Sequence, residues 1–191
     1  MSDNELLVQL VDEQDNPLGT MNKLEAHHLP ALHRAVSVLV FNSAGDWLLH
    51  RRAAGKYHSA CLWTNACCTH PYPGEAHAVA ARRRLQEEMG MDAGEELLHL
   101  FDFVYRAKVD EMLTEYEYDR VFTLVSDALP QPHPEEVDEW RYISPDTLQE
   151  EMKEHPECFT EWFKMIYQKV QTSWFMVHGS LFIVHCSKFK V

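Results

Sequence analysis

A short apolar run, AVSVLVF at residues 35–41, restricts the fold of this 191-residue chain more than any other feature. Its β-branched residues favour an extended strand, and its largely apolar character indicates burial inside a protein. The turn-forming segment NSAGD follows, and WLLHRR at residues 47–52 is expected to return as a second strand. Further strands are expected at residues 6–12, 100–108 and 115–126. A chain of this length can bury a hydrophobic core of its own, so the strands predict a sheet within one domain.

Helix signals lie between the strands and after them. Residues 76–89, AHAVAARRRLQEEM, are rich in helix formers, and Gly90 stands where a glycine commonly ends a helix. Ser144 followed by a proline is typical of a helix start, here near residues 145–153. A last helix is expected at residues 159–170. A helix between strands and a helical C-terminal region predict an α/β sandwich.

The segments between these elements set the limits of the domain. Residues 53–74 lack a regular pattern, and PQPHPEE at residues 130–136 is typical of a loop. We find no internal repeat and no inter-domain linker, so we assign residues 1–171 to one domain. Residues 172–191 form a C-terminal extension whose apolar, strand-favouring sequence fits no motif.

The charge and the cysteine content exclude several classes of protein. The formal net charge of −13 disfavours nucleic acid as a partner, because that partner requires a basic surface. No segment approaches the roughly 20 apolar residues of a membrane span, and the polar N-terminus does not resemble a signal peptide. Five scattered cysteines without a secretory signal indicate free thiols in a reducing compartment. We therefore expect a cytoplasmic protein that does not bind membranes.

The segment NACCTHP at residues 65–71 concentrates reactive side chains. Cys67, Cys68 and His70 could form a metal knuckle, a disulfide, or a catalytic thiol beside a metal ligand. Adjacent cysteines are too constrained to form an unstrained disulfide easily. The chain has no CxxC pair, which disfavours a structural zinc knuckle. The catalytic thiol remains the preferred interpretation.

Histidines and carboxylates elsewhere offer ligands for a metal ion. Glu115 and Glu117 in EYEYD lie on one face of the expected strand, because residues two apart in a strand point the same way. They fit either a solvated edge strand or a shared metal. His27, His33 and His70, each alone more typical of an ordinary surface or core histidine, would complete a mixed N/O site. Such a site suits Zn, Mn or Mg.

The helical segment GEAHAVAARRRLQEEMGM also matches most of the Nudix pattern G-x5-E-x7-R-E-U-x-E-E-x-G-U, in which U is apolar. The matching positions are Glu75, Arg83, Leu85, Glu87, Glu88, Gly90 and Met91. Thr69 replaces the first glycine, and Arg84 replaces the glutamate after the arginine. Because these carboxylates hold Mg²⁺ on a diphosphate, the loss of one weakens the case for a hydrolase. An ordinary charged helix with ion pairs four residues apart remains the alternative.

Several motifs occur together and in order. They are G-T-x-x-K-x-x-x-H (Gly19 to His27), L-H-R-A-x-S-V with His33, L-L-x-R-R-x-x-x-K ending at Lys56, W-T-N-x-C-C-x-H-P (Trp63 to Pro71), R-R-x-x-x-E-x-G ending at Gly90, Y-R-A from Tyr105, E-x-E from Glu115, and W-F-K from Trp162. In these motifs the chain resembles type 1 isopentenyl-diphosphate delta-isomerase over residues 5–170. The W-T-N-x-C-C-x-H-P and E-x-E motifs are the most specific.

The resemblance implies a Nudix-like α/β/α sandwich with a mixed β-sheet, and an enzyme of isoprenoid biosynthesis that converts isopentenyl diphosphate to dimethylallyl diphosphate. It implies one divalent metal (Mn, Zn or Mg) held by His27, His33, His70, Glu115 and Glu117. The spacing from His27 to His33 is one residue short for this family, so His28 remains a competing ligand. It also implies a Mg²⁺ ion that arrives with the diphosphate and contacts Glu88 and the Cys68 backbone.

The resemblance further implies a catalytic set of Cys68, Glu117 and Tyr105, and diphosphate-binding cations at Lys23, Arg52, Lys56 and Arg84. Cys67 is then a dispensable neighbour. An unactivated alkene needs a strong acid on one face and a base on the other, and Glu117 and Cys68 fit these roles. Nearby cations and the metal are expected to lower the pKa of Cys68.

The aromatic residues Trp63 and Trp162 are expected either to stabilise a tertiary carbocation or simply to pack in the core. A Nudix-type pyrophosphohydrolase and a non-catalytic metal-binding or thiol-redox protein are the alternative functions. The sequence leaves open the oligomeric state and the individual roles of Arg51, Arg82 and Arg83.

Overall fold

The computed structural model describes residues 6–94 and 96–177 of the chain. Its strands are β1 (Leu7–Val11), β2 (Pro17–Asn22), β3 (His33–Phe41), β4 (Trp47–Arg52), β5 (Trp63–Thr64), β6 (Cys67–Thr69), β7 (Leu98–Lys108), β8 (Thr114–Val125) and β9 (Val137–Ile143). Its α-helices are α1 (Lys23–His28), α2 (His77–Met89), α3 (Pro145–Glu154) and α4 (Glu161–Val177), and a short 3₁₀ helix spans Pro156–Cys158. No helix in this part of the chain is long and apolar enough to cross a membrane.

The strand β3, which contains the apolar run, is the centre of the sheet. Along one side it pairs in parallel with β8, which in turn pairs with β7 in the antiparallel sense. Along the other side it meets β1, β6 and β4 in succession, all antiparallel. The strands β5 and β9 continue the sheet from β4. The sheet is therefore mixed, as the sequence predicted.

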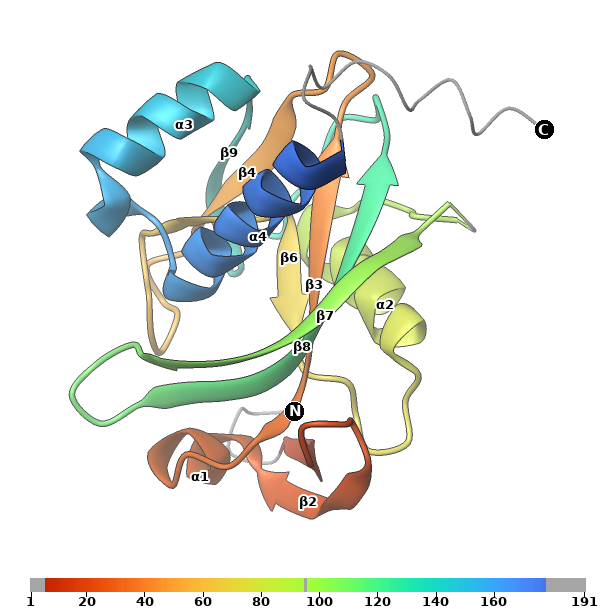
Figure 1. Cartoon of the computed structure of the whole chain (residues 1–191), viewed down its shortest axis with the longest axis vertical. Coiled ribbons are helices and arrows are strands. Elements are labelled where there is room, and N and C mark those ends of the chain that lie inside the picture. The colour runs from red at the N-terminus through yellow and green to blue at the C-terminus, as the bar shows by residue number, and fades with distance from the viewer. Residues whose placement is uncertain (1–5, 95, 178–191) are drawn as a thin grey trace.

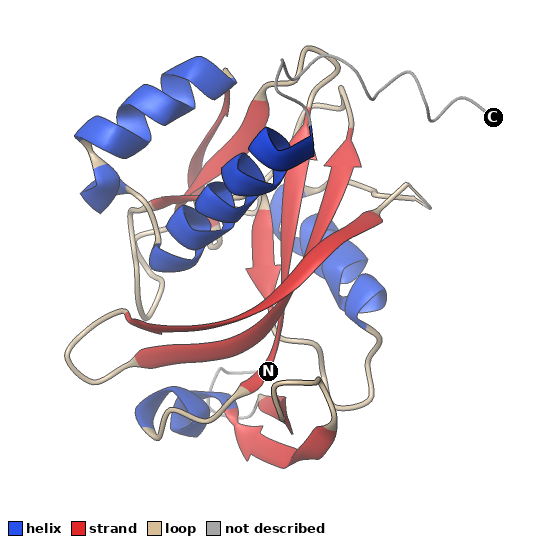
Figure 2. Cartoon of the chain, viewed as in Figure 1, coloured by secondary structure: helices blue, strands red, loops and turns tan. Residues whose placement is uncertain are grey.

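Alternation along β3 divides the hydrophobic core into two layers. Val36 and Val38 pack with residues of α2 such as Leu85 on one face. Leu39 packs with α4 residues such as Phe163 on the other face. Helices therefore cover both faces of one sheet (Figures 1 and 2), and the predicted α/β/α sandwich is confirmed.

The end of α2 is fixed by contact with the loop at residues 130–136. Gly90 has a left-handed φ of 63°, and a Cβ atom at this position would lie 2.5 Å from the carbonyl oxygen of Gln131. The backbone N–H of Gln131 donates to Met89 and that of His133 donates to Glu88, at 2.8 Å each. These bonds satisfy carbonyls at the C-terminus of α2. Glycine is therefore required where the sequence predicted the helix to end.

Several elements were not predicted from the sequence. The helix α1 is only six residues long, and it begins where the Asn22 side chain accepts hydrogen bonds from Leu24 and Glu25. The strands β2, β5, β6 and β9 fall in segments without clear alternation. The last helix continues to Val177, so the strand-favouring residues just after 172 are helical. The rest of the expected extension, residues 178–191, lies outside the described residues.

Candidate active site

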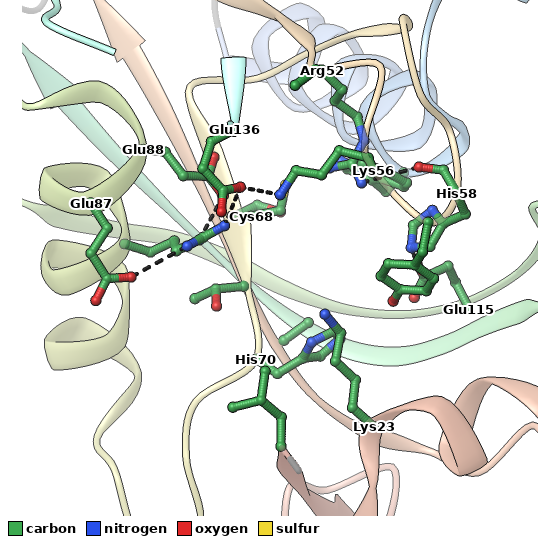
Figure 3. A pocket seen from close by; sticks show the side chains of 18 of the residues that line it. Lys23, Arg52, Lys56, His58, Cys68, His70, Glu87, Glu88, Glu115 and Glu136 are labelled. Carbon is green, nitrogen blue, oxygen red and sulfur yellow. Dashed lines mark hydrogen bonds and ion pairs between the residues drawn. The ribbon is translucent and has the colours of Figure 1, made fainter. Parts of the chain in front are cut away.

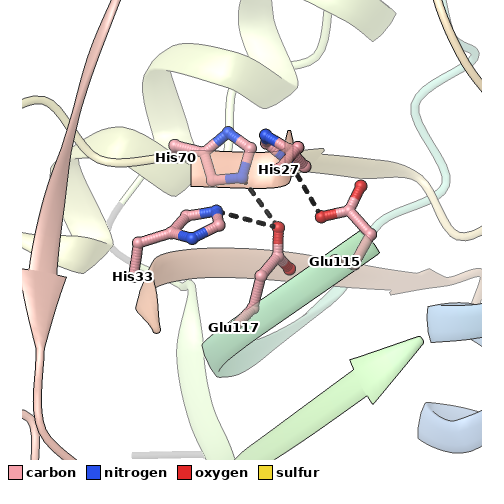
Figure 4. A group of neighbouring side chains, drawn as sticks. All are labelled: His27, His33, His70, Glu115 and Glu117. Carbon is pink, nitrogen blue, oxygen red and sulfur yellow. Dashed lines mark hydrogen bonds and ion pairs between the residues drawn. The ribbon is translucent and has the colours of Figure 1, made fainter. Parts of the chain in front are cut away.

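Five ligand-type side chains from four parts of the fold meet below the sheet. His27 lies on α1, His33 begins β3, and His70 follows β6. Glu115 and Glu117 share a face of β8, where Glu117 stands beside His33 in the parallel register. Each of the five offers a ligand atom, and these atoms all lie within 4.8 Å of one another. Figure 4 shows the three rings and two carboxylates converging on a common point.

The hydrogen bonds of the histidines leave their lone pairs directed at this point. His27 Nδ1 lies 2.5 Å from the carbonyl oxygen of Lys23, and His33 Nδ1 lies 2.7 Å from that of Ala31. A carbonyl only accepts, so both Nδ1 atoms carry the proton and both Nε2 atoms are free to coordinate. Backbone carbonyls orient metal-binding histidines in this way.

The Nε2 atoms of the three histidines lie near the two carboxyl groups of the cluster. His27 Nε2 lies 3.0 Å from Glu115 Oε2, and buried His33 Nε2 has no hydrogen-bond partner in the described structure. His70 Nε2 lies 2.7 Å from Glu117 Oε1. His27 carries its proton on Nδ1, and despite burial the pKa of Glu115 is held well below its ordinary value by its hydrogen bonds with histidines. The lone pairs of His27 Nε2 and Glu115 Oε2 then need a positive charge between them. The five residues therefore fit a divalent cation with nitrogen and oxygen ligands.

The ionisation of the cluster supports the same conclusion. Burial lowers the pKa of His33 to about 4 and that of His70 well below its ordinary value, so both rings are neutral, as metal ligands must be. Burial and the neighbouring Glu115 raise the pKa of Glu117. Burial alone would lower the pKa of His27, but its hydrogen bond with Glu115 raises it. A positive charge is thus favoured between His27 and Glu115.

The structure resolves which of two adjacent histidines faces the cluster. His27 is fully buried within it, whereas His28 is exposed on the outer side of α1. His28 Nδ1 lies 3.3 Å from the carbonyl oxygen of Met112, away from the other ligands. Among the two candidates from the sequence, His27 is the one that the fold brings to the other four.

A cavity of about 1000 Å³ opens beside the cluster. It is lined by nine of the residues that the sequence analysis selected: Lys23, Arg52, Lys56, Cys68, His70, Arg84, Glu88, Tyr105 and Trp162, and by both carboxylates of the cluster. Figure 3 shows Arg52 and Lys56 on the upper side of this cavity, and Glu115, His70 and Lys23 below them. The cavity therefore joins a cationic end to the metal-type cluster.

The expected role of Trp63 in the substrate pocket stays a prediction. Trp63 is not among the residues that line this cavity, and its ring packs against the guanidinium of Arg141, 4.2 Å from the ring centroid. The strand β5, which carries Trp63, and the strand β9, which carries Arg141, both pair with β4. Trp162 does line the cavity, and the guanidinium carbon of Arg52 lies 5.3 Å from its ring centroid.

The two adjacent cysteines point to opposite faces of β6. Cys67 is fully buried in the layer between the sheet and α2, and Cys68 packs on the other side, where it lines the cavity. Both are free thiols. This division follows from alternation in a strand, and it agrees with the prediction that only Cys68 faces the site.

The thiol of Cys68 is held by an amide whose orientation is fixed. The Nδ2 of Asn65 donates to the carbonyls of Val38 and Cys67 at 3.1 and 2.8 Å. Its Oδ1 must therefore face the sulfur of Cys68, 3.2 Å away, and accept the S–H. The hydroxyl of Ser37 lies 3.3 Å from the same sulfur.

The protein groups around Cys68 do not by themselves lower its pKa, and the expected lowering by a bound metal ion stays a prediction. Burial raises its pKa far above the ordinary value, and the nearby carboxylate of Asp119 raises it further. Asp119 is itself buried, which raises its pKa to about 7, and it accepts a 2.8 Å hydrogen bond from Ser37. The sequence analysis missed Asp119, although it stands two residues after Glu117 on the same face of β8. Alternation alone could have identified it.

Tyr105 contacts the carboxylate of Glu117 directly. Its hydroxyl donates to Glu117 Oε2 at 2.6 Å, across the β7–β8 pair that brings the two residues opposite each other. Oε1 of the same carboxylate faces the histidines. Glu117 therefore joins the metal-type cluster to a hydroxyl that lines the cavity.

The cationic end of the cavity carries a carboxylate, Glu136, that the sequence did not predict. Glu136, in the loop before β9, accepts from both Lys56 and Arg84, the latter at 2.6 Å. Arg84 Nε also lies 2.6 Å from buried Glu88, and Glu87 is 3.3 Å away. Two of the expected diphosphate-binding cations are thus neutralised by protein carboxylates. The loop bonds that cap α2 hold Glu136 near them.

His58 is a further residue that the sequence analysis missed. Its Nε2 lies 3.0 Å from Glu115 Oε1, the carboxylate oxygen that His27 does not contact. Burial lowers the pKa of His58, so the ring is neutral. It belongs to the segment HSAC, which has no regular pattern in the sequence, and only the fold brings it to β8.

Comparison with known proteins agrees with this geometry. The NUDIX domain family matches residues 31–163. Isopentenyl-diphosphate Delta-isomerase 2 of Aromatoleum aromaticum is 47% identical over 163 residues, which cover 85% of each chain. The isopentenyl-diphosphate Delta-isomerase of Pectobacterium atrosepticum is 45% identical over 167 residues, covering 87% of this chain and 92% of that protein.

Solved structures of low sequence identity show the same fold. The crystal structure of DR0079 from Deinococcus radiodurans has a TM-score of 0.72 at 21% identity, and the match covers 85% of this chain and 98% of that one. A MutT protein from Methanosarcina mazei has a TM-score of 0.59 and covers 74% of this chain and 94% of that one. Because close relatives and the domain match both span most of its length, the chain belongs to the isopentenyl-diphosphate Delta-isomerase family of NUDIX-domain proteins.

Proposed function

We propose that this protein converts isopentenyl diphosphate to dimethylallyl diphosphate by moving one carbon–carbon double bond. The observation that carries the proposal is the position of Cys68 and Glu117 in one cavity. Both line it, and they come from different strands, β6 and β8, which flank β3 on opposite sides. A proton donor and a proton acceptor that approach a flat five-carbon chain from two directions are what the isomerisation requires.

The three histidines, Glu115 and Glu117 are proposed to hold one divalent ion, with Mn, Zn and Mg all compatible with nitrogen and oxygen ligands. A bound divalent cation withdraws negative charge from Glu117 and makes a proton on that carboxyl more acidic. Tyr105 orients the carboxyl through its 2.6 Å hydrogen bond to Oε2. A second ion, Mg²⁺, is proposed to accompany the diphosphate near Glu88.

Glu117 is proposed to give a proton to the terminal alkene carbon, which leaves a tertiary carbocation. Cys68 then removes a proton from the carbon next to the diphosphate-bearing carbon. Since burial raises the pKa of Cys68, the thiol must first lose its proton before it can act as a base. The Ser37 hydroxyl, 3.3 Å from the sulfur and 2.8 Å from Asp119, offers a path to a buried carboxylate. The ring of Trp162 can stabilise the cation and exclude water from it.

The diphosphate is proposed to bind Arg52, Lys56 and Arg84 at the cationic end and Lys23, all of which line the cavity. Arginine offers forked donors to phosphate oxygens, and lysine offers a point charge. This end anchors the substrate so that its alkene reaches the cluster. The rest of the acidic surface contributes nothing to the attraction of an anion.

The test is proton NMR of isopentenyl diphosphate in D₂O with metal-loaded protein. Dimethylallyl diphosphate carrying deuterium should accumulate without release of phosphate, and Glu117→Gln should abolish the exchange. A wild-type protein that binds metal but moves no deuterium into the substrate would contradict the proposal. Steady release of phosphate would support a pyrophosphohydrolase instead.

The hydrolase alternative is not favoured by the geometry of α2. A Nudix hydrolase uses the carboxylates of this helix to hold Mg²⁺ on the diphosphate. Here Arg84 replaces one of them and its guanidinium engages two others, Glu87 and Glu88. The helix therefore offers fewer carboxylates to a metal ion and one more cation to a phosphate.

A further inference from the structure

His58 is held in an unusual loop between β4 and β5. The residues that follow it, Ser59 and Cys61, have left-handed φ angles of 50° and 63°, which non-glycine residues adopt at a cost in backbone strain. Backbone bonds pin the loop, since Cys61 N–H donates to Arg52 and Arg52 N–H donates to Leu62, at 3.0 and 2.9 Å. Strain that the surrounding structure maintains is common at functional sites. The loop places His58, only 8% exposed, against the wall of the cavity.

The tautomer of His58 differs from that of the cluster histidines. A carboxylate oxygen only accepts, so Nε2 of His58 donates its proton to Glu115 Oε1 at 3.0 Å. The other ring nitrogen is then an acceptor, and it lies 3.2 Å from the Ser59 hydroxyl, which donates to it. His27 and His33 instead carry their proton on Nδ1 and direct Nε2 at the cluster. His58 is therefore built as a donor to the carboxylate, not as a ligand.

This contact decides which oxygen of Glu115 faces the cluster. With Oε1 bonded to His58, Oε2 is the oxygen that lies 3.0 Å from His27 Nε2. We propose that His58 is a positioning residue that locks the Glu115 carboxylate with Oε2 toward the metal ion and thereby strengthens metal binding. The inference rests on the metal site of the proposed function. It assigns to His58 a role that its irregular sequence context does not suggest.

The side chain of His58 can be changed without disturbing the diphosphate end. Arg52 reaches this residue through the backbone, because its Nη2 donates to the carbonyl oxygen of His58 at 3.2 Å. Any residue at position 58 supplies that carbonyl. A variant of His58 should thus weaken metal binding while inorganic diphosphate still binds with its wild-type affinity.

The test measures Co²⁺ affinity of the metal-stripped full-length protein by competition with a coloured chelator. His58→Ala should bind Co²⁺ about 10–100-fold more weakly than wild type, as found when a partner that orients a ligand is lost. His58→Gln should recover most of the affinity, because its amide can donate at a similar reach. His28→Gln is the matched control, since it removes an exposed histidine next to His27 and should leave affinity unchanged.

The visible spectrum of bound Co²⁺ separates positioning from ligation. If His58→Ala saturated with Co²⁺ shows the same absorption bands as wild type, the ligand set is unchanged and the inference is supported. Wild-type Co²⁺ affinity in His58→Ala would overturn the inference. Altered Co²⁺ absorption bands in His58→Ala that His58→Gln fails to restore would overturn it as well, because they would show that His58 is a ligand. If wild type binds no Co²⁺, the metal site and this inference both fail. If wild type binds Co²⁺ but does not isomerise the substrate, only the proposed reaction fails.

Discussion

Replacing Glu136 by Gln removes a carboxylate that is bonded to two of the cavity's cations. Glu136 accepts from Lys56 and from Arg84, so in the absence of substrate both cations already have an anionic partner. The hydrogen bond from Lys56 and the charge of Arg84 outweigh burial and hold the pKa of Glu136 below its ordinary value, so it is ionised at neutral pH. A free diphosphate that binds the same cations must approach this negative charge.

The size of the effect follows from the geometry. Arg84 Nη2 lies 2.6 Å from Glu136 Oε2. A phosphate oxygen bound to Arg84 would therefore lie about 5 Å from the Glu136 carboxylate. At an effective dielectric constant of about 20, the repulsion between two unit charges at this separation is about 3 kcal/mol. The Glu136 side chain is 23% exposed, so solvent screens part of this repulsion. After this screening, we expect a repulsion of about 1.4 kcal/mol to remain, which corresponds to a tenfold change in Kd.

The assay is calorimetric titration of inorganic diphosphate into metal-stripped protein, with a chelator present. Glu136→Gln should bind about tenfold more tightly than wild type. With Mg²⁺ present the gain should be smaller, because the cation already offsets the carboxylate. Glu150→Gln, which removes the same charge from an exposed position on α3 outside the cavity, should behave like wild type. Weaker binding by Glu136→Gln in the chelator would refute the reasoning and show that Glu136 instead organises the two cations.

The remaining predictions concern the thiols, the tyrosine and a buried histidine. Cys68→Ala should abolish deuterium exchange, whereas Cys67→Ala should retain it but lose about 1 kcal/mol of stability in urea unfolding, because its sulfur fills the core. Tyr105→Phe should lower kcat about 10–100-fold with little change in KM, since the lost hydrogen bond is made to Glu117 and not to substrate. Burial lowers the pKa of His50 to about 3 in the folded protein. As the pH falls, the imidazole of the unfolded chain is therefore protonated before that of the folded chain. The free energy of unfolding should fall by up to about 1.4 kcal/mol per pH unit as pH drops from about 6.5 toward 3. His50→Asn should flatten that slope in urea unfolding measured at several pH values.

The central strand and the helix α2 could be predicted because their sequences are locally consistent. AVSVLVF is β-branched and apolar, and β3 spans His33–Phe41. The helix formers of 76–89 end at Gly90, as observed. By contrast, β9 reads VDEWRYI and mixes charged and aromatic residues, because only part of it is buried. Its pairing with β4 is a tertiary effect that local propensity does not contain.

Local sequence patterns were still less able to predict the candidate site. The registers that set Glu117 beside His33 and Cys68 beside Ser37 join residues that are distant in sequence, so no local pattern could supply them. The cluster was expected only through the family resemblance. His58 and Glu136 were missed because each lies in an irregular segment and gains its role from a partner more than fifty residues away in the chain.

The position of Arg84 explains how a NUDIX helix can serve an isomerase. In the Nudix pattern this position is a glutamate that helps to hold metal ions, whereas here its guanidinium is 2.6 Å from both Glu88 and Glu136. The substitution converts one carboxylate of the helix into a cation. This cation forms ion pairs with Glu88 on the helix and with Glu136 in the loop before β9. We expect a diphosphate to bind the cations at this end of the cavity. Fewer carboxylates would then be available to hold a metal ion near the phosphoanhydride bond that a hydrolase breaks. The metal-type cluster instead lies on α1, β3, β8 and the segment after β6, beside Tyr105, where the proposed mechanism gives a proton to carbon. In the proposed mechanism, one fold thus separates anchoring of the diphosphate from the proton chemistry that changes the hydrocarbon.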